Sequence, residues 1–204
     1  KLVPIKTPIG KKSLFDMGRI DPEKMYSNVQ KWNWRSINDG KIYLDEQSKR
    51  NAISMRNSLM RLSTAFAVQG DTIKAIEVLD LSLDKMPIKD FDHYSLSLDY
   101  PEMYYRLGAV EKARKTAETL IGLFREKLVW HSTFTKEEFD LIFEDFDLTF
   151  RYLYRGVLEQ VQENEVDYTY FKKLQDEFNG TLELFQHIIP NQETAPEDLE
   201  LLQE

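Results

Sequence analysis

Hydrophobic residues recur at helical intervals along most of this chain. Between about residues 46 and 69 the apolar positions are Ile53, Leu59, Leu62, Phe66 and Ala67. A stripe of about six turns follows Thr135, and its members are Phe139, Ile142, Phe143, Phe146, Phe150, Leu153, Val157 and Val161. A third stripe holds Phe171, Leu174, Phe178, Leu182, Phe185 and Ile188. Spacings of three and four residues place such side chains on one helix face, so the pattern predicts amphipathic helices.

Capping and turn residues divide these stripes into separate helices. Asp21 before Pro22 is typical of a helix start, and the helix should run to about Trp32 or Trp34. Thr135 and Glu138 have the spacing of a capping box. Helix ends or breaks are expected at Gly70, Pro87, Asn164 and Pro190, with a turn over 38–40 and a short extended link over 42–46.

Two segments 38 residues apart carry the same pattern. The first contains Leu59, Leu62, Ser63, Phe66, Gly70, Ala75, Leu79, Ser82 and Pro87, and the second contains Tyr100, Pro101, Tyr104, Gly108, Ala113, Ala117 and Leu120. Residue types and intervals in the first segment resemble a tetratricopeptide repeat, a helical hairpin with a glycine at its turn. The resemblance implies stacked hairpins, which usually bind other proteins.

Pro101 affects the start of the second hairpin. A helix from Tyr94 to Leu107 would contain this proline in its interior, where it removes a hydrogen bond and kinks the helix. We therefore expect the helix to begin late, close to Asp99 or Tyr100. The partner helix should run from about Val110 to Lys127 or beyond.

The predicted fold class is all-α, with about two tetratricopeptide-like hairpins and a long C-terminal helix pair packed on them as a cap. Residues 1–20 should form an extended arm, because Pro4 and Pro8 disfavour a helix. Residues 21–189 should form a single helical domain, and residues 190–204 an acidic flexible tail.

Charge and composition narrow the possible partners. The 204 residues include 27 basic and 35 acidic side chains, a formal net charge of −8. This charge disfavours nucleic acid as the main partner. The chain has no cysteine and therefore neither a disulfide nor a thiolate site. No segment has the roughly 18 apolar residues that would cross a bilayer. Because residue 1 is Lys, we expect the chain to be a piece of a longer protein.

Residues with catalytic or metal-binding chemistry do not form a known motif. His93, His131 and His187 lack the spacing of metal-binding pairs, and we expect surface or capping roles. The carboxylates of residues 137–147 alternate with phenylalanines, as on a solvated helix face, although a weak calcium site is an alternative. There is no phosphate-binding loop and no nucleophile beside a base. We expect neither an enzyme nor a bound metal or cofactor.

Candidate binding residues follow from the repeat pattern. Tetratricopeptide-like arrays bind partners on a face built by the first helix of each hairpin. The first-helix face should comprise Asn57, Met60, Thr64 and Val68 in the first hairpin, and Leu98, Glu102, Tyr105 and Arg106 in the second. This mixture suits a peptide or protein segment. Trp32, Trp34, Tyr43 and Trp130 could instead line a cleft, but we expect Trp32 and Trp130 in the core.

A more specific resemblance covers roughly residues 1–120. It rests on residues 2–8 (LVPIKTP), 18–21 (GRID), 25–26 (MY), 31–34 (KWNW), 38–39 (ND), 43–46 (YLDE), 55–57 (MRN) and 75–80 (AIEVLD). These segments resemble the C-terminal part of a family of multi-spanning membrane proteins of unknown function from gut-associated Gram-negative bacteria. The membrane domain of that family is similar to glycosyltransferases of the protein O-mannosyltransferase type.

This resemblance implies an extracytoplasmic, periplasmic domain attached to a membrane-bound glycosyltransferase of the inner membrane. The catalytic acids of such enzymes lie in the membrane part, so no catalytic residue is transferred to this chain. Two hypotheses follow. The first is a non-catalytic interaction module that binds a protein segment, including a segment of its own membrane domain. The second is an accessory domain that contacts the acceptor protein or glycan, with Trp34 or Tyr105 stacking on sugar rings.

Overall fold

The computed structural model describes residues 20–34, 43–91, 97–165 and 168–188. Within these ranges the chain is helical and contains no β-strand, which confirms the all-α class and the helical hairpins. The expected arm over 1–20, apart from Ile20, and the tail over 190–204 lie outside the described residues. So do the turn over 38–40, the stop at Pro190 and His93.

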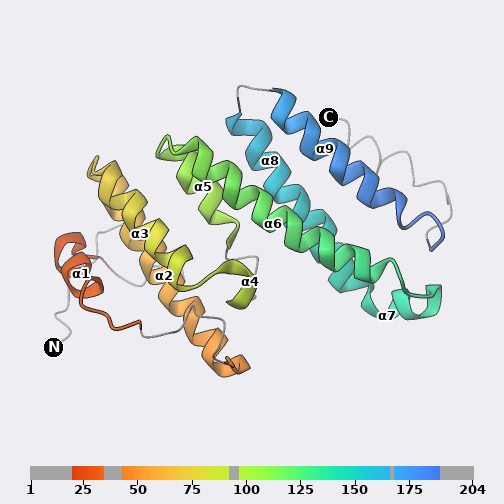
Figure 1. The fold of residues 1–204 in the computed structure, drawn as a ribbon, viewed down its shortest axis with the longest axis horizontal. Coiled ribbons are helices and arrows are strands. Elements are labelled where there is room, and N and C mark those ends of the chain that lie inside the picture. The colour runs from red at the N-terminus through yellow and green to blue at the C-terminus, as the bar shows by residue number, and fades with distance from the viewer. Residues whose placement is uncertain (1–19, 35–42, 92–96, 166–167, 189–204) are drawn as a thin grey trace, which may run out of the picture. The chain divides into compact units, whose positions relative to one another are not determined.

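The contacts within the chain form two compact units, Lys1–Asp92 and His93–Glu204. Each unit contains one of the two predicted hairpins, and each is described separately below (Figure 1). The prediction that residues 21–189 form a single domain stays a prediction.

The first unit contains α1 (Pro22–Val29), α2 (Glu46–Val68), α3 (Thr72–Lys85) and the short α4 (Ile88–Phe91). Aspartates begin its three longer helices. Asp21, Asp45 and Asp71 each accept a hydrogen bond from the backbone amide three residues later, at 2.7–3.1 Å. These bonds satisfy amide groups that have no partner within a helix. Two sequence predictions were wrong: α1 ends at Val29, before Trp32, and α4 was not expected.

A buried arginine fixes the end of the first hairpin. The side chain of Arg56, on α2, is only 3% exposed, and its Nη2 atom donates to the Met86 carbonyl at 2.6 Å. Its guanidinium group also lies 5.6 Å from the ring centre of Phe91, on α4. The positive charge therefore lies at the C-terminus of α3, where the helix dipole favours a cation.

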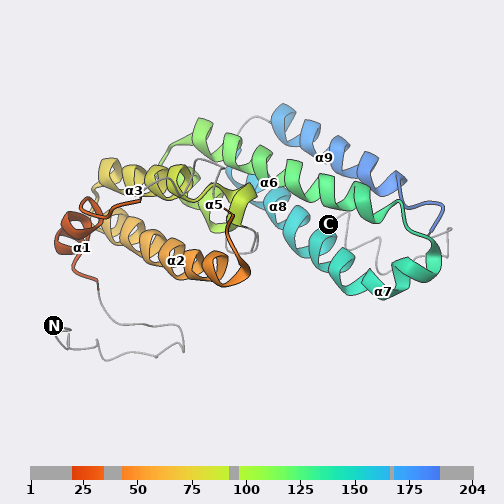
Figure 2. The same ribbon diagram turned by 60° about the horizontal axis from the view of Figure 1, so that its bottom comes forward.

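The second unit contains α5 (Asp99–Arg106), α6 (Val110–His131), α7 (Lys136–Asp147), the π-helix η2 (Leu148–Tyr154), α8 (Arg155–Asn164) and α9 (Tyr168–Glu183). After a turn at residues 132–135, α7, η2 and α8 form one continuous helix that runs back along α6 (Figure 2). The α8 segment also contacts α5 and α9. The long C-terminal helices therefore cover the second hairpin.

Pro101 lies in the first turn of α5, which begins at Asp99 as predicted. A residue in the first turn has no intrahelical acceptor for its amide hydrogen, so proline costs no hydrogen bond there. The late start of α5 thus resolves the conflict between proline and helix.

The two hairpins share the same turn geometry. Gly70 and Gly108 have φ angles of +82° and +74°, the left-handed conformation that glycine adopts most easily. After each glycine, an amide donates to a carbonyl five residues earlier: Asp71 to Phe66, at 3.0 Å, and Ala109 to Tyr104, at 2.9 Å. Both turns are therefore Schellman-type helix ends.

Burial repeats with the same offset of 38 residues. The equivalent pairs Leu62/Tyr100, Phe66/Tyr104, Ala75/Ala113, Val78/Thr116, Leu79/Ala117, Ser82/Leu120 and Met86/Phe124 are all buried. Ala75 and Ala113 have no exposed surface, and such small side chains allow the two helices of a hairpin to approach closely. The internal repeat predicted from the sequence is thus present in the packing.

Aromatic rings fill the distal core of the second unit. Phe146 stacks on Phe150 with ring centres 5.6 Å apart, and Phe150 stacks on Phe178 of α9 at 4.6 Å. Most of the predicted stripe is buried, but Phe143 is 46% exposed. In α9 we expected Leu182 on the buried face, but Leu182 is 36% exposed and the preceding residue, Thr181, is buried instead. The capping box at Thr135 and Glu138 is confirmed, with both reciprocal hydrogen bonds present.

Candidate interaction surface

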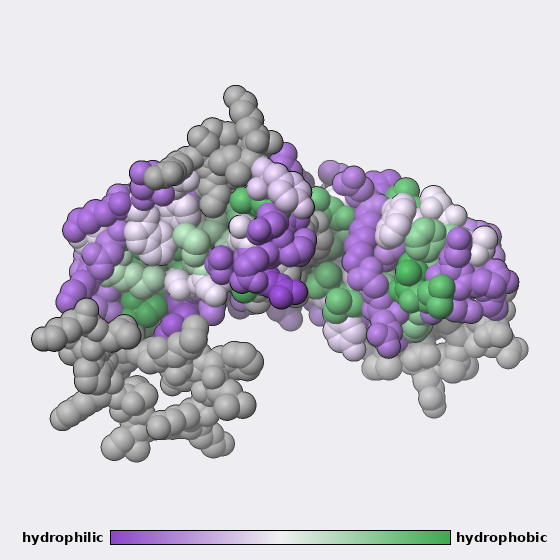
Figure 3. Space-filling view, turned by 90° about the horizontal axis from the view of Figure 1, so that it is seen from below, coloured by the Kyte–Doolittle hydropathy of each residue, from purple (hydrophilic) through white to green (hydrophobic). Residues whose placement is uncertain are grey.

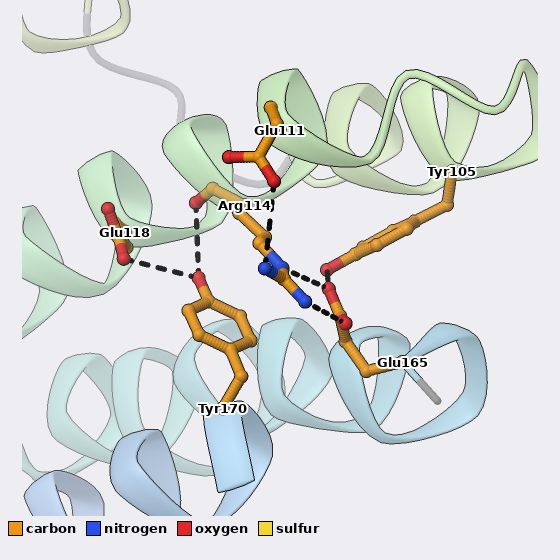
Figure 4. A network of polar contacts seen from close by, with 6 residues as sticks. All are labelled: Tyr105, Glu111, Arg114, Glu118, Glu165 and Tyr170. Atoms are coloured by element: carbon orange, nitrogen blue, oxygen red, sulfur yellow. Dashed lines mark hydrogen bonds and ion pairs between the residues drawn. The ribbon is translucent and has the colours of Figure 1, made fainter. Parts of the chain in front are cut away.

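A polar network connects four helical segments of the second unit (Figure 4). Arg114, on α6, makes a bidentate ion pair with Glu165, which follows α8, at 2.7 and 2.6 Å. The hydroxyl group of Tyr105, on α5, donates to Glu165 at 2.8 Å. Tyr170, on α9, lies under the Arg114 guanidinium group at 4.7 Å and donates to the Arg114 carbonyl and to Glu118, each at 3.4 Å.

The electrostatics of this network indicate a structural role. Burial, followed by the hydrogen bond to Glu165, raises the pKa of Tyr105 well above its usual value. Hydrogen bonding to Glu165 likewise raises the pKa of Arg114. Both groups are therefore held in the protonated form. Since the Glu165 side chain is only 3% exposed and already accepts from two residues, it is not placed to act as a base on a substrate.

This network corrects the predicted position of Tyr105. The repeat pattern placed it on the exposed first-helix face, but its side chain is only 8% exposed. Glu165 lies 60 residues further along the chain and could not be identified from the sequence as the partner that draws the Tyr105 hydroxyl inwards. Tyr105 therefore cannot stack on a sugar ring in this conformation.

The remaining predicted site residues lie on the first helix of each hairpin, except Leu98, which precedes α5. On α2, Asn57 is exposed, Val68 is 80% exposed, and Met60 and Thr64 are half-buried. In the second unit, Glu102 and Arg106 are exposed on α5, and Leu98, just before α5, is half-buried. The structure thus leaves a mixed polar and apolar surface on the first helix of each hairpin. The binding role of these residues stays a prediction.

Neither the described histidines nor the acidic residues form a metal site. We expected surface or capping roles for the histidines. His187 is exposed, whereas His131, the last residue of α6, is fully buried, so a surface role was wrong for His131. The described parts of the chain contain no group of three histidines or carboxylates that could hold a metal ion. Lys127 neutralises Asp145 at 2.7 Å, and Arg151 pairs with Asp147 at 2.8 Å.

His131 lies in an apolar and aromatic environment at the end of α6. Its Nε2 atom is 3.2 Å from Asp145 Oδ2, and the rings of Trp130 and Phe146 lie 5.5 and 6.5 Å away. Burial lowers the pKa of His131, and the attraction of Asp145 opposes this effect only in part. The imidazole is therefore neutral near pH 7, and the arrangement is that of a packed core histidine.

The tryptophans are more exposed than predicted. Trp130 is 57% exposed and packs edge-on against Phe134 at 4.8 Å, so its placement in the core was wrong. Trp32 is 37% exposed and contacts the half-buried Trp34 at 5.4 Å. Tyr43 is 90% exposed. These exposures do not indicate a closed aromatic cleft.

One surface feature was missed in the sequence. Leu141, Leu148 and Tyr152, here called the α7 stripe, lie on the outer side of α7 and η2 and are 87%, 47% and 66% exposed. Their intervals of seven and four residues place them on one helix face. The signal was visible in the sequence, but the stronger phenylalanine stripe on the opposite side of the same helix obscured it.

Comparisons of this chain with protein-family models, with curated proteins and with solved structures gave no match. Among the described residues, no helix is both long and apolar enough to span a lipid bilayer.

Proposed function

We propose that this chain is a non-catalytic protein-interaction module built from tetratricopeptide-like hairpins. In this proposal it forms the extracytoplasmic, periplasmic part of a membrane-bound glycosyltransferase of a bacterial inner membrane. Its partner is a protein segment, either from another protein or from its own membrane domain. The membrane attachment and location rest on the sequence resemblance alone.

The observation that carries the interaction module is the structural repeat. Two hairpins have equivalent left-handed glycines and equivalent buried residues at an offset of 38 residues. In repeats of this kind, large side chains fill the contact between the helices, and the outer residues of the first helix are free to vary. An interaction surface can therefore change without loss of the core.

The outer surface of α2 has the chemistry of a peptide-binding face. Val68 offers an exposed branched side chain, Met60 an adaptable thioether, and Asn57 an amide that can both donate and accept. The Thr64 hydroxyl donates to the Met60 carbonyl in its own helix, so its methyl group is the part left for a partner. This combination fits a segment that buries one or two apolar side chains.

A pair of matched variants tests the proposal. Val68 lies at the end of α2, and Ile73 lies at the start of α3 and is 71% exposed. Both are exposed β-branched residues near the same turn, so replacement by aspartate should leave the fold intact. We expect the purified chain to capture a specific protein from the native membrane fraction. Val68→Asp should abolish this capture, and Ile73→Asp should preserve it.

Two controls make the result decisive. Circular dichroism should show equal helix content for both variants, and the captured protein should bind the purified chain directly when it is itself purified. Equal capture by the Val68→Asp variant would contradict binding through α2, and absence of any direct partner would contradict the interaction module.

Contact with a glycan is the second candidate, favoured by the exposed aromatic residues. Trp130 is 57% exposed and Tyr152 is 66% exposed. Aromatic faces of this kind can stack on sugar rings, whereas the original candidate Tyr105 is buried. Binding of the purified chain to an oligosaccharide array, with loss in Trp130→Ala, would favour this function over the first.

A further inference from the structure

We propose that the α7 stripe is a second docking surface, and that its occupant is a basic amphipathic helix of another protein. This surface lies on a different helix from the first-helix face, so the inference does not depend on the function proposed above. It rests on three observations: an apolar row, an unneutralised acidic border and a local π-helix.

The apolar row has the dimensions of a helix-binding site. Leu141 and Tyr152, the ends of the row, are eleven positions apart, which corresponds to roughly 16 Å along a helix axis. At 87% exposure, Leu141 makes almost no contact with its own unit. Seen from below, the second unit shows hydrophobic surface bordered by hydrophilic side chains (Figure 3). Three large side chains in one row fit the apolar face of a second helix.

The border of the row is strongly acidic. Six of the twelve residues of α7 are acidic and one is basic. Asp145 and Asp147 are neutralised by Lys127 and Arg151, and Glu138 is engaged in the capping box. Glu137, Asp140 and Glu144 form no ion pair with another residue that the structure describes. Their charge beside an apolar row selects lysine and arginine on a partner.

Charge also disfavours other occupants of the α7 stripe. A second copy aligned in parallel on this face would place Glu137 and Glu144 against like charges, which a basic helix avoids. Nucleic acid and anionic lipid would be repelled for the same reason. A helix with leucine-type residues on one face and lysine or arginine beside them matches both properties.

The π-helix makes this position unusual within the long helix. Leu148 and Tyr152 belong to η2, in which each turn contains an additional residue. Segments of this kind occur frequently at functional sites. Here η2 keeps Phe150 and Tyr154 in the core and leaves Leu148 and Tyr152 exposed.

A designed peptide provides the test. The probe is a fluorescein-labelled helical peptide of about 18 residues, roughly 27 Å long, with leucines on one face and lysines on the other. Fluorescence anisotropy should show saturable binding to the full chain that weakens as salt is raised. The same peptide with glutamate in place of lysine should not bind.

Variants then locate the binding site. Leu141→Ala combined with Tyr152→Ala should weaken binding roughly tenfold, and Glu137→Lys combined with Glu144→Lys should weaken it at least as much. The matched control combines Leu184→Ala with Glu163→Lys, which alters one exposed apolar and one exposed acidic residue elsewhere in the unit and should leave affinity unchanged.

The other outcomes overturn the proposal. Absence of binding by the lysine peptide, equal binding by the glutamate peptide, or equal weakening in the control variant would each contradict a specific basic-helix site. All substituted residues are exposed, so circular dichroism should confirm that every variant remains folded. Because the probe does not involve Val68, failure here leaves the capture experiment on α2 unaffected.

Discussion

The same substitution, glycine to alanine, should have opposite effects at two positions of the second unit. Gly108 forms the turn between α5 and α6 with a φ angle of +74°, whereas Gly122 lies within α6. A methyl group added at either position meets no atom within 4 Å. Steric clashes with neighbouring side chains are therefore absent at both sites, and the backbone conformation alone decides the sign.

The magnitudes follow from the backbone conformations. A non-glycine residue in the left-handed region costs about 1–2 kcal/mol. Part of this cost is offset because alanine restricts the unfolded chain, by about 0.4–1 kcal/mol. Gly108→Ala should therefore lower the free energy of unfolding by about 1 kcal/mol. Gly122→Ala should raise it by about 0.5–1 kcal/mol, since alanine is the better helix former.

The assay uses the three tryptophans of the chain. Replacement of Trp32 and Trp34 by phenylalanine leaves Trp130 as the only tryptophan, and it lies in the second unit. Urea unfolding followed by its fluorescence then reports this unit. Gly180→Ala, within α9 and also without close neighbours, is a second stabilising control. Unchanged or increased stability in Gly108→Ala would refute the left-handed turn and the equivalence of the two hairpins.

Three further predictions concern individual interactions. Arg56→Met should destabilise the first unit by about 1.5–3 kcal/mol, because it removes a charged donor from the buried Met86 carbonyl. In urea unfolding, Arg50→Met, on the exposed face of α2, should show no comparable loss of stability. Thr135→Ala should lower the free energy of unfolding by about 1 kcal/mol, because the capping box is lost. Urea unfolding measures this change, and an unchanged stability would contradict the cap. Burial raises the pKa of Tyr154 from 10.0 to about 12. As the pH rises, the unfolded state releases the hydroxyl proton at a lower pH than the folded state does. The free energy of unfolding should therefore fall between about pH 10 and pH 12. Tyr154→Phe should reduce this alkaline loss in pH-dependent unfolding, and an unchanged profile would show that Tyr154 does not contribute.

Local signals in the sequence predicted most of the helical architecture. The caps at Asp21 and Thr135 were correct, because each depends on residues only three positions apart. The late start of α5 was also predictable, since proline restricts its own helix directly. The ends of α1 and α9, the short α4 and the π-helix η2 differed from the prediction: α9 ends at Glu183, before the predicted Phe185 and Ile188. Helix ends depend on weak local signals.

The candidate sites were less predictable because they depend on contacts distant in sequence. Tyr105 fits an exposed repeat position until Glu165 and Arg114 are placed beside it. Trp130 has the size of a core residue, yet the end of α6 leaves it exposed beside Phe134. The α7 stripe could have been identified from its spacing, but which of two apolar faces packs inwards is decided by the arrangement of α6 and α9.

The π-helix in the long C-terminal helix restricts how the length of this segment can change during evolution. A π-helix holds one residue more than the same stretch of α-helix needs, so loss of one residue from η2 would let this segment wind as an α-helix and keep α8 in register with α7. Removal of one residue from α7 would instead rotate α8 by about 100°. Val157 and Val161, both fully buried, would then turn away from the core. Homologous chains that retain this fold should therefore accept loss of one residue within Leu148–Tyr154 more readily than loss of one residue within Lys136–Asp147.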